Sequence, residues 1–346
     1  MRRILLSGLI LTTIVLAPAG IAAQSDPGTP LSIEGANATL IVHTPAGTGA
    51  LAVIAGSTLY EYGGGDWQPT GTNVPDGLAV WSAGVPGVIL VGDHAPCLRG
   101  GPAIDFRHSD DGGASWATVD GASDFRPLAV WEESGLALAA SCAGLQLSRD
   151  GGLTWEVVPG IEHGWEITAF AEVSGAGSGP VVLLGLTGEG GTSYLHRVDF
   201  SDPDVPVVSA DLRMYYAIGG LAGTGETYLL AAMDGVWVSR DAGATWSRMA
   251  TGLDQVVLEQ DPAVYGLPED FDPAAVGLFS VAVLPGERGG ALIGSVDGLY
   301  LGTANLDRFT KVADTAGRVE DVRFDGSGTL VLYLVDGVVY SVPLPE

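Results

Sequence analysis

The chain has 346 residues, with 52 glycines, 16% charged residues and a formal net charge of −26. A surface this acidic argues against nucleic acid or an anionic membrane as a partner, and it favours either cationic ligands or simple solubility outside the cell. Short apolar runs bounded by Gly, Pro, Asp and Ser recur throughout, which is typical of an all-β protein.

Residues 1–23 have the features of a secretory signal peptide. Arg2 and Arg3 precede an apolar run, and small residues follow as far as Ala23. We expect cleavage near Ala22 or Ala23, which leaves a secreted or extracytoplasmic protein of residues 24–346 with no membrane span. The alternative is an uncleaved N-terminal anchor, because the apolar run is nearly long enough to cross a bilayer.

Seven repeat units follow the signal segment. Each has an apolar strand, a second strand ending in a small turn, a third strand, a capped turn and a fourth strand. Most intervals between units are near the roughly 40 to 50 residues of a four-stranded propeller blade. The second strands are expected to begin near Leu51, Val88, Leu136, Val181, Tyr228, Ala291 and Leu330. The sequence therefore predicts a single seven-bladed β-propeller over residues 24–346, with six or eight blades as the alternatives.

The last unit holds three strands where the others hold four. An isolated strand over Pro30–Glu34 has no unit of its own. We predict that it supplies the missing outer strand of the last blade, which would close the ring without an unpaired edge.

An eight-residue pattern, Ser-x-Asp-x-Gly-x-(Ser/Thr)-Trp, occurs at 109–116, 148–155 and 239–246. Gly permits a positive φ in a tight turn, and Ser and Asp side chains bond backbone N–H groups from inside it. The pattern predicts a capped turn between the third and fourth strands of a blade. A structural role is thus expected for Ser109, Asp111, Gly113, Trp116, Ser148, Asp150, Gly152, Trp155, Ser239, Asp241, Gly243 and Trp246.

This pattern resembles the Asp-box, or BNR, repeat of sialidases, two-propeller xyloglucanases, sortilin-like receptors and photosystem II assembly factors. The resemblance implies a turn on the outer part of each blade, away from the ligand face. Length and single-propeller layout are most similar to the photosystem II assembly factors, which implies a binding scaffold. Their arginine patch has no clear counterpart in this acidic chain, and a xyloglucanase would need a second propeller.

Sialidase-like glycoside hydrolysis is the enzymatic alternative. That resemblance implies an arginine clamp for a carboxylate and a tyrosine nucleophile, with Arg126, Arg213 and Tyr216 as the candidates. The chain departs from the family pattern, because Phe125-Arg126-Pro127 lacks the expected Ile and follows the first capped turn. Arg213 and Tyr216 are expected near an inner strand, and Arg318 and Arg323 would offer further cations. No metal cluster, phosphate loop or Ser/His/Asp order is recognisable, so no cofactor or metal is predicted.

In a four-stranded blade, the second-to-third turn and the connection to the next blade lie on one face, and the capped turns lie on the other. The insertions at 92–101, 159–165 and 252–277 all belong to the first face. Loops on a rigid scaffold commonly carry function. The hypothesis is therefore a ligand site on this face, formed by Asp93, His94, Arg99, Glu162, His163, Trp165 and Tyr265.

Cys97 and Cys142 fall in second-to-third turns of neighbouring units. An even number of cysteines in an exported chain predicts one disulfide, with two separate thiols as the alternative. The leading interpretation is a secreted, non-enzymatic propeller that binds a protein or glycan partner on its insertion-bearing face. A sialidase-like hydrolase and a structural envelope component are the alternatives.

Overall fold

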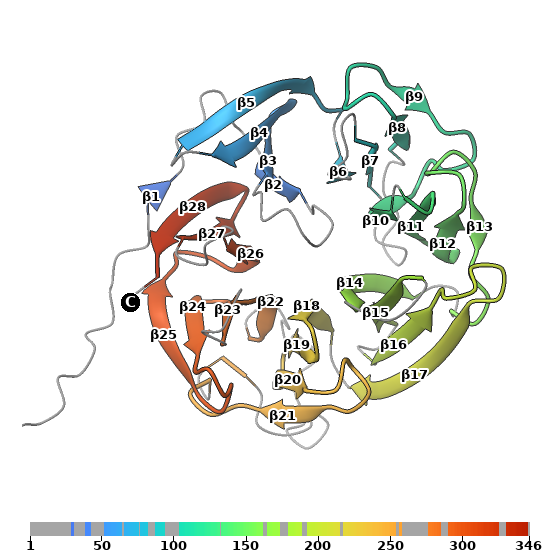
Figure 1. Cartoon of the computed structure of the whole chain (residues 1–346). Coiled ribbons are helices and arrows are strands. Elements are labelled where there is room, and N and C mark those ends of the chain that lie inside the picture. The colour runs from blue at the N-terminus through green and yellow to red at the C-terminus, as the bar shows by residue number, and fades with distance from the viewer. Residues whose placement is uncertain are drawn as a thin grey trace, which may run out of the picture.

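The computed structural model describes residues 29–30, 39–42, 52–63, 66–75, 77–81, 87–93, 104–131, 133–161, 165–173, 179–188, 192–214, 217–253, 256–257, 276–284, 290–324 and 330–344. These residues form seven antiparallel four-stranded sheets arranged in a ring (Figure 1). The chain is a seven-bladed β-propeller, so the predicted fold class and blade number are confirmed. The predicted signal peptide, 1–23, lies outside the described residues.

The strands follow one another from the ring axis outward in each blade. Blade one holds β2 (Thr39–Val42), β3 (Ala52–Ala55), β4 (Thr58–Gly63) and β5 (Asp66–Asn73), and blade two holds β6 (Leu78–Trp81), β7 (Ile89–Gly92), β8 (Arg107–Ser109) and β9 (Ala117–Thr118). Blade three holds β10 (Arg126–Trp131), β11 (Leu136–Ser141), β12 (Gly144–Ser148) and β13 (Glu156–Val157). Blade four holds β14 (Glu166–Val173), β15 (Val181–Thr187), β16 (Ser193–Asp199) and β17 (Val207–Met214).

Blade five holds β18 (Ile218–Thr224), β19 (Thr227–Ala232), β20 (Gly235–Ser239) and β21 (Ser247–Met249). Blade six holds β22 (Leu278–Val283), β23 (Ala291–Ser295), β24 (Gly298–Gly302) and β25 (Phe309–Asp314). Blade seven holds β26 (Val319–Phe324), β27 (Leu330–Val335) and β28 (Val338–Pro343), with β1 (Thr29–Pro30) as its outer strand. The expected starts of the second strands are confirmed to within one residue.

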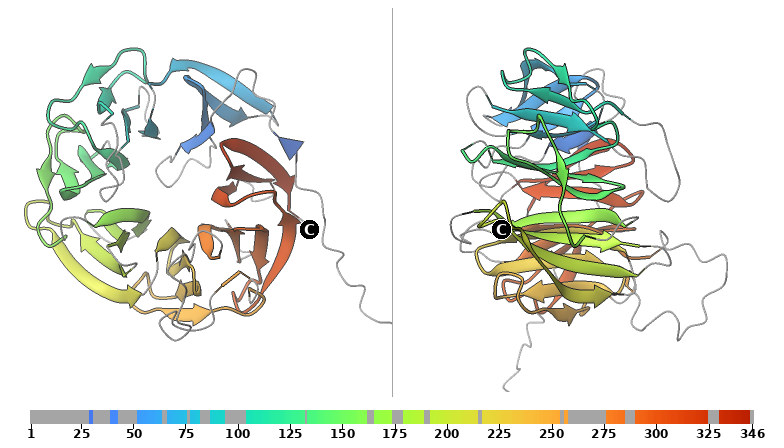
Figure 2. Two further views of the ribbon diagram at one scale, coloured as in Figure 1. Left: turned by 180° about the vertical axis from the view of Figure 1, so that it is seen from behind. Right: turned by 90° about the vertical axis from the view of Figure 1, so that its right-hand side faces the viewer.

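The ring is closed by the N-terminal strand. Thr29 pairs with Ser341 and Pro30 with Tyr340, which places β1 on the outer edge of β28. The predicted closure is confirmed, although β1 starts one residue earlier than expected and residues 31–34 lie outside the described residues. The view from behind in Figure 2 shows β1 beside β28 at the rim.

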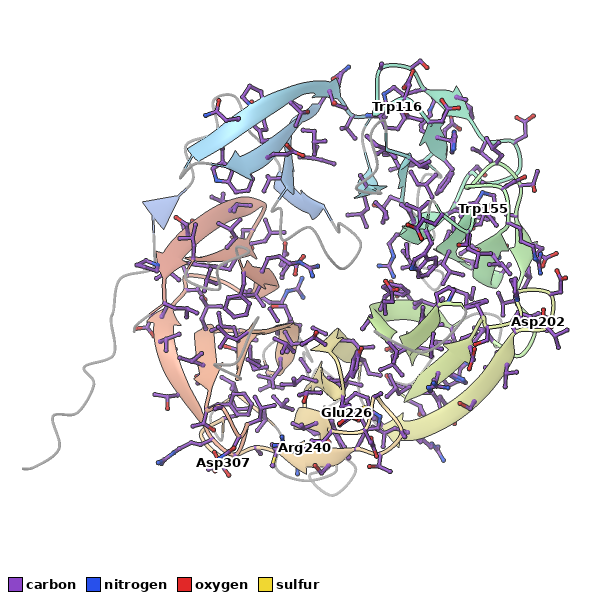
Figure 3. The ribbon with its side chains drawn as sticks, in the orientation of Figure 1. Trp116, Trp155, Asp202, Glu226, Arg240 and Asp307 are labelled. Carbon is purple, nitrogen blue, oxygen red and sulfur yellow. The ribbon has the colours of Figure 1, made fainter. Side chains whose placement is uncertain are left out.

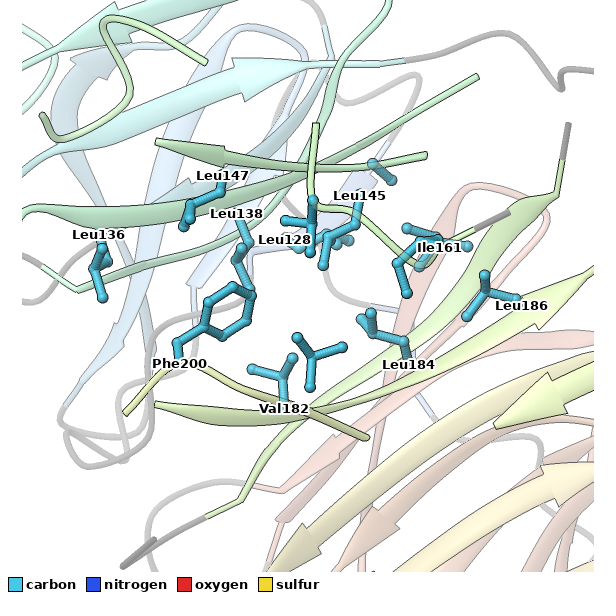
Figure 4. Packing of buried hydrophobic residues seen from close by; sticks show 14 residues of the cluster. Leu128, Leu136, Leu138, Leu145, Leu147, Ile161, Val182, Leu184, Leu186 and Phe200 are labelled. Carbon is cyan, nitrogen blue, oxygen red and sulfur yellow. The ribbon is translucent and has the colours of Figure 1, made fainter. Parts of the chain in front are cut away.

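Second strands carry unbroken apolar runs because both of their faces are covered by neighbouring blades. All six residues of β11 and all five of β23 are buried. A large core cluster lies between blades three and four, where Leu138 and Leu145 face Val182, Leu184 and Phe200 (Figure 4). Burial of apolar surface between blades therefore provides the main stabilisation of the ring.

Five inner strands contain a bulge near their first residues. The register shifts between Pro127 and Ala129 in β10, and at the equivalent places in β14, β18, β22 and β26. A bulge leaves one residue unpaired and changes the direction of its side chain. Because all five bulges lie at the same level, they bring side chains from several blades together at one end of the ring.

Candidate functional site

The three copies of the repeated pattern form nearly identical turns, here named the Ser-x-Asp turns. In the blade-three copy, Ser148 Oγ accepts a hydrogen bond from Gly152 N at 2.8 Å and donates one to Asp150 Oδ1 at 2.8 Å. Asp150 also accepts bonds from Thr154 N at 2.8 Å and from Thr154 Oγ1 at 2.7 Å. Asp150 is therefore occupied within its own turn, as its counterparts Asp111 and Asp241 are.

These hydrogen bonds favour the ionised carboxylates. A bond from the Ser115 side chain, followed by one from the Ser115 backbone, lowers the pKa of Asp111 to about 2. The Thr245 side chain and backbone likewise lower the pKa of Asp241. A carboxylate held ionised by internal donors is a poor general acid.

The tryptophan that ends each pattern anchors the turn. Trp155 Nε1 donates to Gly152 O and Trp246 Nε1 to Gly243 O, both at 3.0 Å, whereas Trp116 Nε1 reaches Asn73 O of the preceding blade. Figure 3 shows Trp116, Asp202, Arg240 and Asp307 spaced along the outer part of the ring. The repeated pattern thus builds the rim of the propeller.

Strand direction separates the two faces of the ring. Because every pairing within a blade is antiparallel, the first-to-second and third-to-fourth turns share one face, named the turn face. The second-to-third turns and the connections between blades share the opposite face, named the insertion face. The bulged starts of the inner strands lie at the insertion face.

A cavity of about 210 Å³ lies where these bulged starts meet. Its walls come from six inner strands, β6, β10, β14, β18, β22 and β26. Eleven of the seventeen lining residues are apolar or glycine, and six are polar or charged. The six are Arg126, Thr168, Ser280, Glu320, Asp321 and Arg323. A concave site on which polar groups from several strands converge is a candidate ligand site.

Arg126 is a polar lining residue whose bonding is incomplete within the described structure. Its Nη2 donates to Ile167 O, but its Nε is shut off from solvent and has no hydrogen-bond partner in the described structure. No described carboxylate lies within the 4.0 Å that defines an ion pair. Burial lowers the pKa of Arg126, and the nearby Glu166 and then Asp93 raise it in part. Arginine nevertheless stays charged in proteins, so the cavity contains a cation that has no ion-pair partner among the described residues.

Neighbouring groups already bond Asp321, Ser280 and Thr168, and one nitrogen of Arg323. Arg323 Nη2 lies 3.0 Å from Asp321 Oδ2, and Asp321 Oδ1 accepts the Val322 N–H at 2.8 Å. Burial raises the pKa of Asp321, while Arg323 lowers it in part. Ser280 Oγ donates to Val319 O at 3.2 Å, and Thr168 Oγ1 donates to Gly185 O at 3.4 Å.

Two of the seven predicted ligand residues are described by the structure. Asp93 directly follows β7 and is close enough to Arg126 to affect its pKa. Trp165 precedes β14, is half-buried, and packs against Tyr194 with ring centroids 4.7 Å apart. The others, His94, Arg99, Glu162, His163 and Tyr265, lie outside the described residues, so their role stays a prediction.

Of the two described candidates for sialidase-like chemistry, only Arg126 lines the cavity. Arg213 belongs to β17, the outermost strand of blade four, where its guanidinium lies 5.9 Å from the Tyr194 ring. The expected position near an inner strand is therefore wrong for Arg213. Tyr216 lies outside the described residues, as does Cys97, so the Cys97–Cys142 disulfide stays a prediction.

Sequence reasoning missed Thr168, Ser280 and Asp321, and it named Arg323 only as an additional cation. The registers of five inner strands place Leu128, Thr168, Gly219, Phe279 and Glu320 at the same bulged position, and Ser280 and Asp321 follow it directly. In the described part of the chain, no helix is long and apolar enough to cross a membrane.

Comparison with known proteins supports the fold and goes no further. No protein-family model and no curated protein sequence matches the chain. The computationally designed Ika8 protein is similar in structure, with a TM-score of 0.55 and 11% identity over 92% of this chain and 100% of that chain. The Dos1 propeller gives a TM-score of 0.51 and 11% identity over 85% of this chain and 74% of that chain.

A third similar structure is PorZ, an essential bacterial surface component of the type-IX secretion system of Porphyromonas gingivalis. Its TM-score is 0.50 at 16% identity, over 92% of this chain and 38% of that chain. At such identities the similarities show the propeller fold alone.

Proposed function

We propose that this chain is a non-enzymatic binding propeller, and that its site at the insertion face holds an anionic group of a protein or glycan partner. The observation that carries the proposal is Arg126, a half-buried cation on a cavity wall with an unbonded Nε and no ion-pair partner among the described residues. A buried charge is costly unless it is paired. A ligand carboxylate would supply both the missing charge and the missing acceptor.

The overall charge of −26 does not oppose this role at short range. At physiological ionic strength, charges farther away than about 8 Å are largely screened. Glu320 and Asp321 of the lining are each paired with an arginine, whereas Glu166 and Asp93 are close enough to Arg126 to raise its pKa in part.

Export belongs to the same proposal. Residues 1–23 support it through their signal-like pattern, and the cysteine pair supports an oxidising compartment. Mass spectrometry without reductant should recover the peptides of Cys97 and Cys142 linked to each other. Recovery of two free thiols from freshly secreted protein would contradict this part.

The test is binding of residues 24–346 to two sets of probes. One set is a glycan array with neutral, uronic-acid and sialic-acid members, and the other is a peptide library with free or amidated C-termini. We expect the bound probes to carry a carboxylate, and Arg126→Gln to weaken binding by about 30-fold or more, because the desolvated pair is lost.

Arg107→Gln is the matched control, since Arg107 lies on β8 and pairs with Asp105 at 3.2 Å, away from the cavity. It should bind as the unchanged protein does. Equal binding by the Arg126→Gln variant, or a preference for uncharged probes, would refute the proposal.

A further inference from the structure

The outermost strands of the seven blades form the rim of the ring, and an exposed edge of this kind can pair with a further strand. Six of them carry a feature that discourages such pairing. Four are only two or three residues long, namely β1, β9, β13 and β21. Of the longer ones, β5 contains Pro69 and β25 carries Lys311. Short strands, prolines and lysines are common protections of an exposed sheet edge.

β17 has none of these protections. It spans eight residues, Val207–Met214, without a proline, glycine or lysine, and it follows the outer rim of blade four (Figure 1). Its inner edge pairs with β16, and no described strand pairs with its outer edge. About half of the backbone N–H and C=O groups of an antiparallel strand point to each side, so one set points outward here. The backbone of an extended polypeptide is the ligand that matches such a set.

Side chains of β17 hold this edge in a fixed position. Val208 lies opposite Val198 and packs against the core between blades three and four. At the other end, Met214 is buried in the cluster between blades four and five. A partner that pairs with β17 therefore does not have to order the strand first, which lowers the cost of binding.

Exposed apolar side chains gather at the start of β17. In the described part of the chain five large apolar side chains are exposed, and four of them belong to this stretch of the rim. They are Val205 and Val207 of blade four, at 64% and 62% exposed, and Leu153 and Val157 of blade three. Arg149 of blade three bonds Pro203 O and lies 3.3 Å from Asp204, so the two blades meet here. Exposed apolar side chains that gather in one place mark an interaction surface.

The charges at this end of β17 favour a basic partner. Arg149 is shared by Glu156 and Asp204. Asp202 is exposed, its Oδ1 accepts the Asp204 N–H at 3.1 Å, and no described cation lies within the 4.0 Å that defines an ion pair. A lysine or arginine of a partner would meet this carboxylate. A second copy of this chain would instead bring the same acids and a formal charge of −26.

We propose that β17 binds an extended segment of a partner protein, which pairs with its outer edge as a fifth strand of blade four. The segment has apolar side chains at alternate positions, and one of them covers Val207. It runs antiparallel to β17, as neighbouring strands do in every blade, and a lysine or arginine at its C-terminal end meets Asp202. This surface lies on the rim, away from the cavity at the inner strands, so it does not depend on the proposed function.

The test uses a fluorescent peptide, Thr-Val-Thr-Val-Thr-Val-Thr-Lys-Lys, with residues 24–346. Its C-terminus is amidated, so it offers no terminal carboxylate to Arg126. Fluorescence anisotropy compares it with a peptide whose central valine is proline and with one that ends in Glu-Glu. Proline should weaken binding by about 10-fold or more, because it removes a ladder hydrogen bond. The glutamates should weaken it by about 5-fold or more, because they repel Asp202.

Two protein variants locate the contact. Val207→Lys should weaken binding of the lysine-ending peptide by about 10-fold or more, because a lysine on the edge opposes pairing and repels the basic end. Val338→Lys is the matched control and should bind normally, since Val338 is an exposed valine of β28 in blade seven. Asp202→Asn keeps the acceptor for the Asp204 N–H and should reduce the preference for the lysine-ending peptide over the glutamate-ending one.

Arg126→Gln should bind the peptide as the unchanged protein does. Loss of binding in that variant would place the peptide in the cavity and overturn the inference. Equal binding of the proline-containing peptide, equal effects of Val207→Lys and Val338→Lys, or no binding of any peptide would also overturn it. Analytical ultracentrifugation should find a monomer. A dimer that Val207→Lys dissociates and Val338→Lys keeps would make a second copy the occupant and refute the proposed partner.

Discussion

Ser148→Ala tests whether the Ser-x-Asp turns stabilise the propeller. Ser148 is 1% exposed, and its Oγ is the acceptor for the buried Gly152 N–H at 2.8 Å. Removing that acceptor leaves a buried donor unsatisfied, at about 1–3 kcal/mol. Asp150 also loses one hydrogen bond, but it is exposed to water and keeps the donors of Thr154. We expect a total loss of about 2–3 kcal/mol in the free energy of unfolding.

The assay is urea unfolding followed by tryptophan fluorescence, with Ser247→Ala as the matched control. Ser247 is exposed, and its Oγ donates one weak bond to Val238 O at 3.3 Å, so its loss should cost no more than about 0.5 kcal/mol. Ser109→Ala and Ser239→Ala should resemble Ser148→Ala. In the unchanged protein, Ser109 and Ser239 each accept the equivalent 2.8 Å hydrogen bond from a glycine N–H. If Ser148→Ala were no more destabilising than Ser247→Ala, the stabilising role of the hydroxyl would be refuted.

Gly151 and Gly152 both have positive φ. A Cβ added at Gly151 would have no atom within 4 Å, whereas a Cβ added at Gly152 would lie 2.7 Å from Leu90 Cδ2. Gly151→Ala should therefore cost about 1–2 kcal/mol from backbone strain alone, and Gly152→Ala clearly more in the same urea titration. Acid should weaken the fold in two stages. Burial lowers the pKa of His108 below 6.5, so stability falls as the pH drops below that value, and His108→Gln should remove this first stage. Asp111, with its pKa lowered to about 2, contributes stability that is lost between about pH 4 and pH 2. Arg126→Met should leave the midpoint of urea unfolding unchanged or higher, because an unpaired cation is replaced by an apolar chain of similar shape. Ligand binding should fall. A lower midpoint would instead make Arg126 a structural residue.

Much of the fold could be predicted because its signals are local. The second strands read as continuous apolar runs since both their faces are buried, and β11 and β15 show this most clearly. The capped turns could also be predicted, because Ser148 and Asp150 form their hydrogen bonds within the same eight-residue segment.

The site could not be predicted to the same depth, because it depends on register and on blades far apart in sequence. In a regular strand, alternate side chains point to the same face. A bulge interrupts this alternation in β10 and β26, so the alternation does not show that Arg126 and Asp321 both line the cavity. Arg213 was misplaced for a related reason, since an arginine in a strand carries no mark of inner or outer position. The surroundings of Arg126 are formed by six inner strands, so the sequence of β10 alone does not show whether Arg126 has an ion-pair partner.

The pairing of Thr29 with Ser341 joins positions 312 residues apart, the difference of the two residue numbers. Such a contact raises the contact order of the whole fold, and the closing step must wait until the seventh blade has formed. Until β1 pairs with it, the outer edge of β28 has unpaired backbone groups that another strand could bind. Folding of this propeller is therefore expected to pass through an open ring whose most aggregation-prone surface is the seam itself.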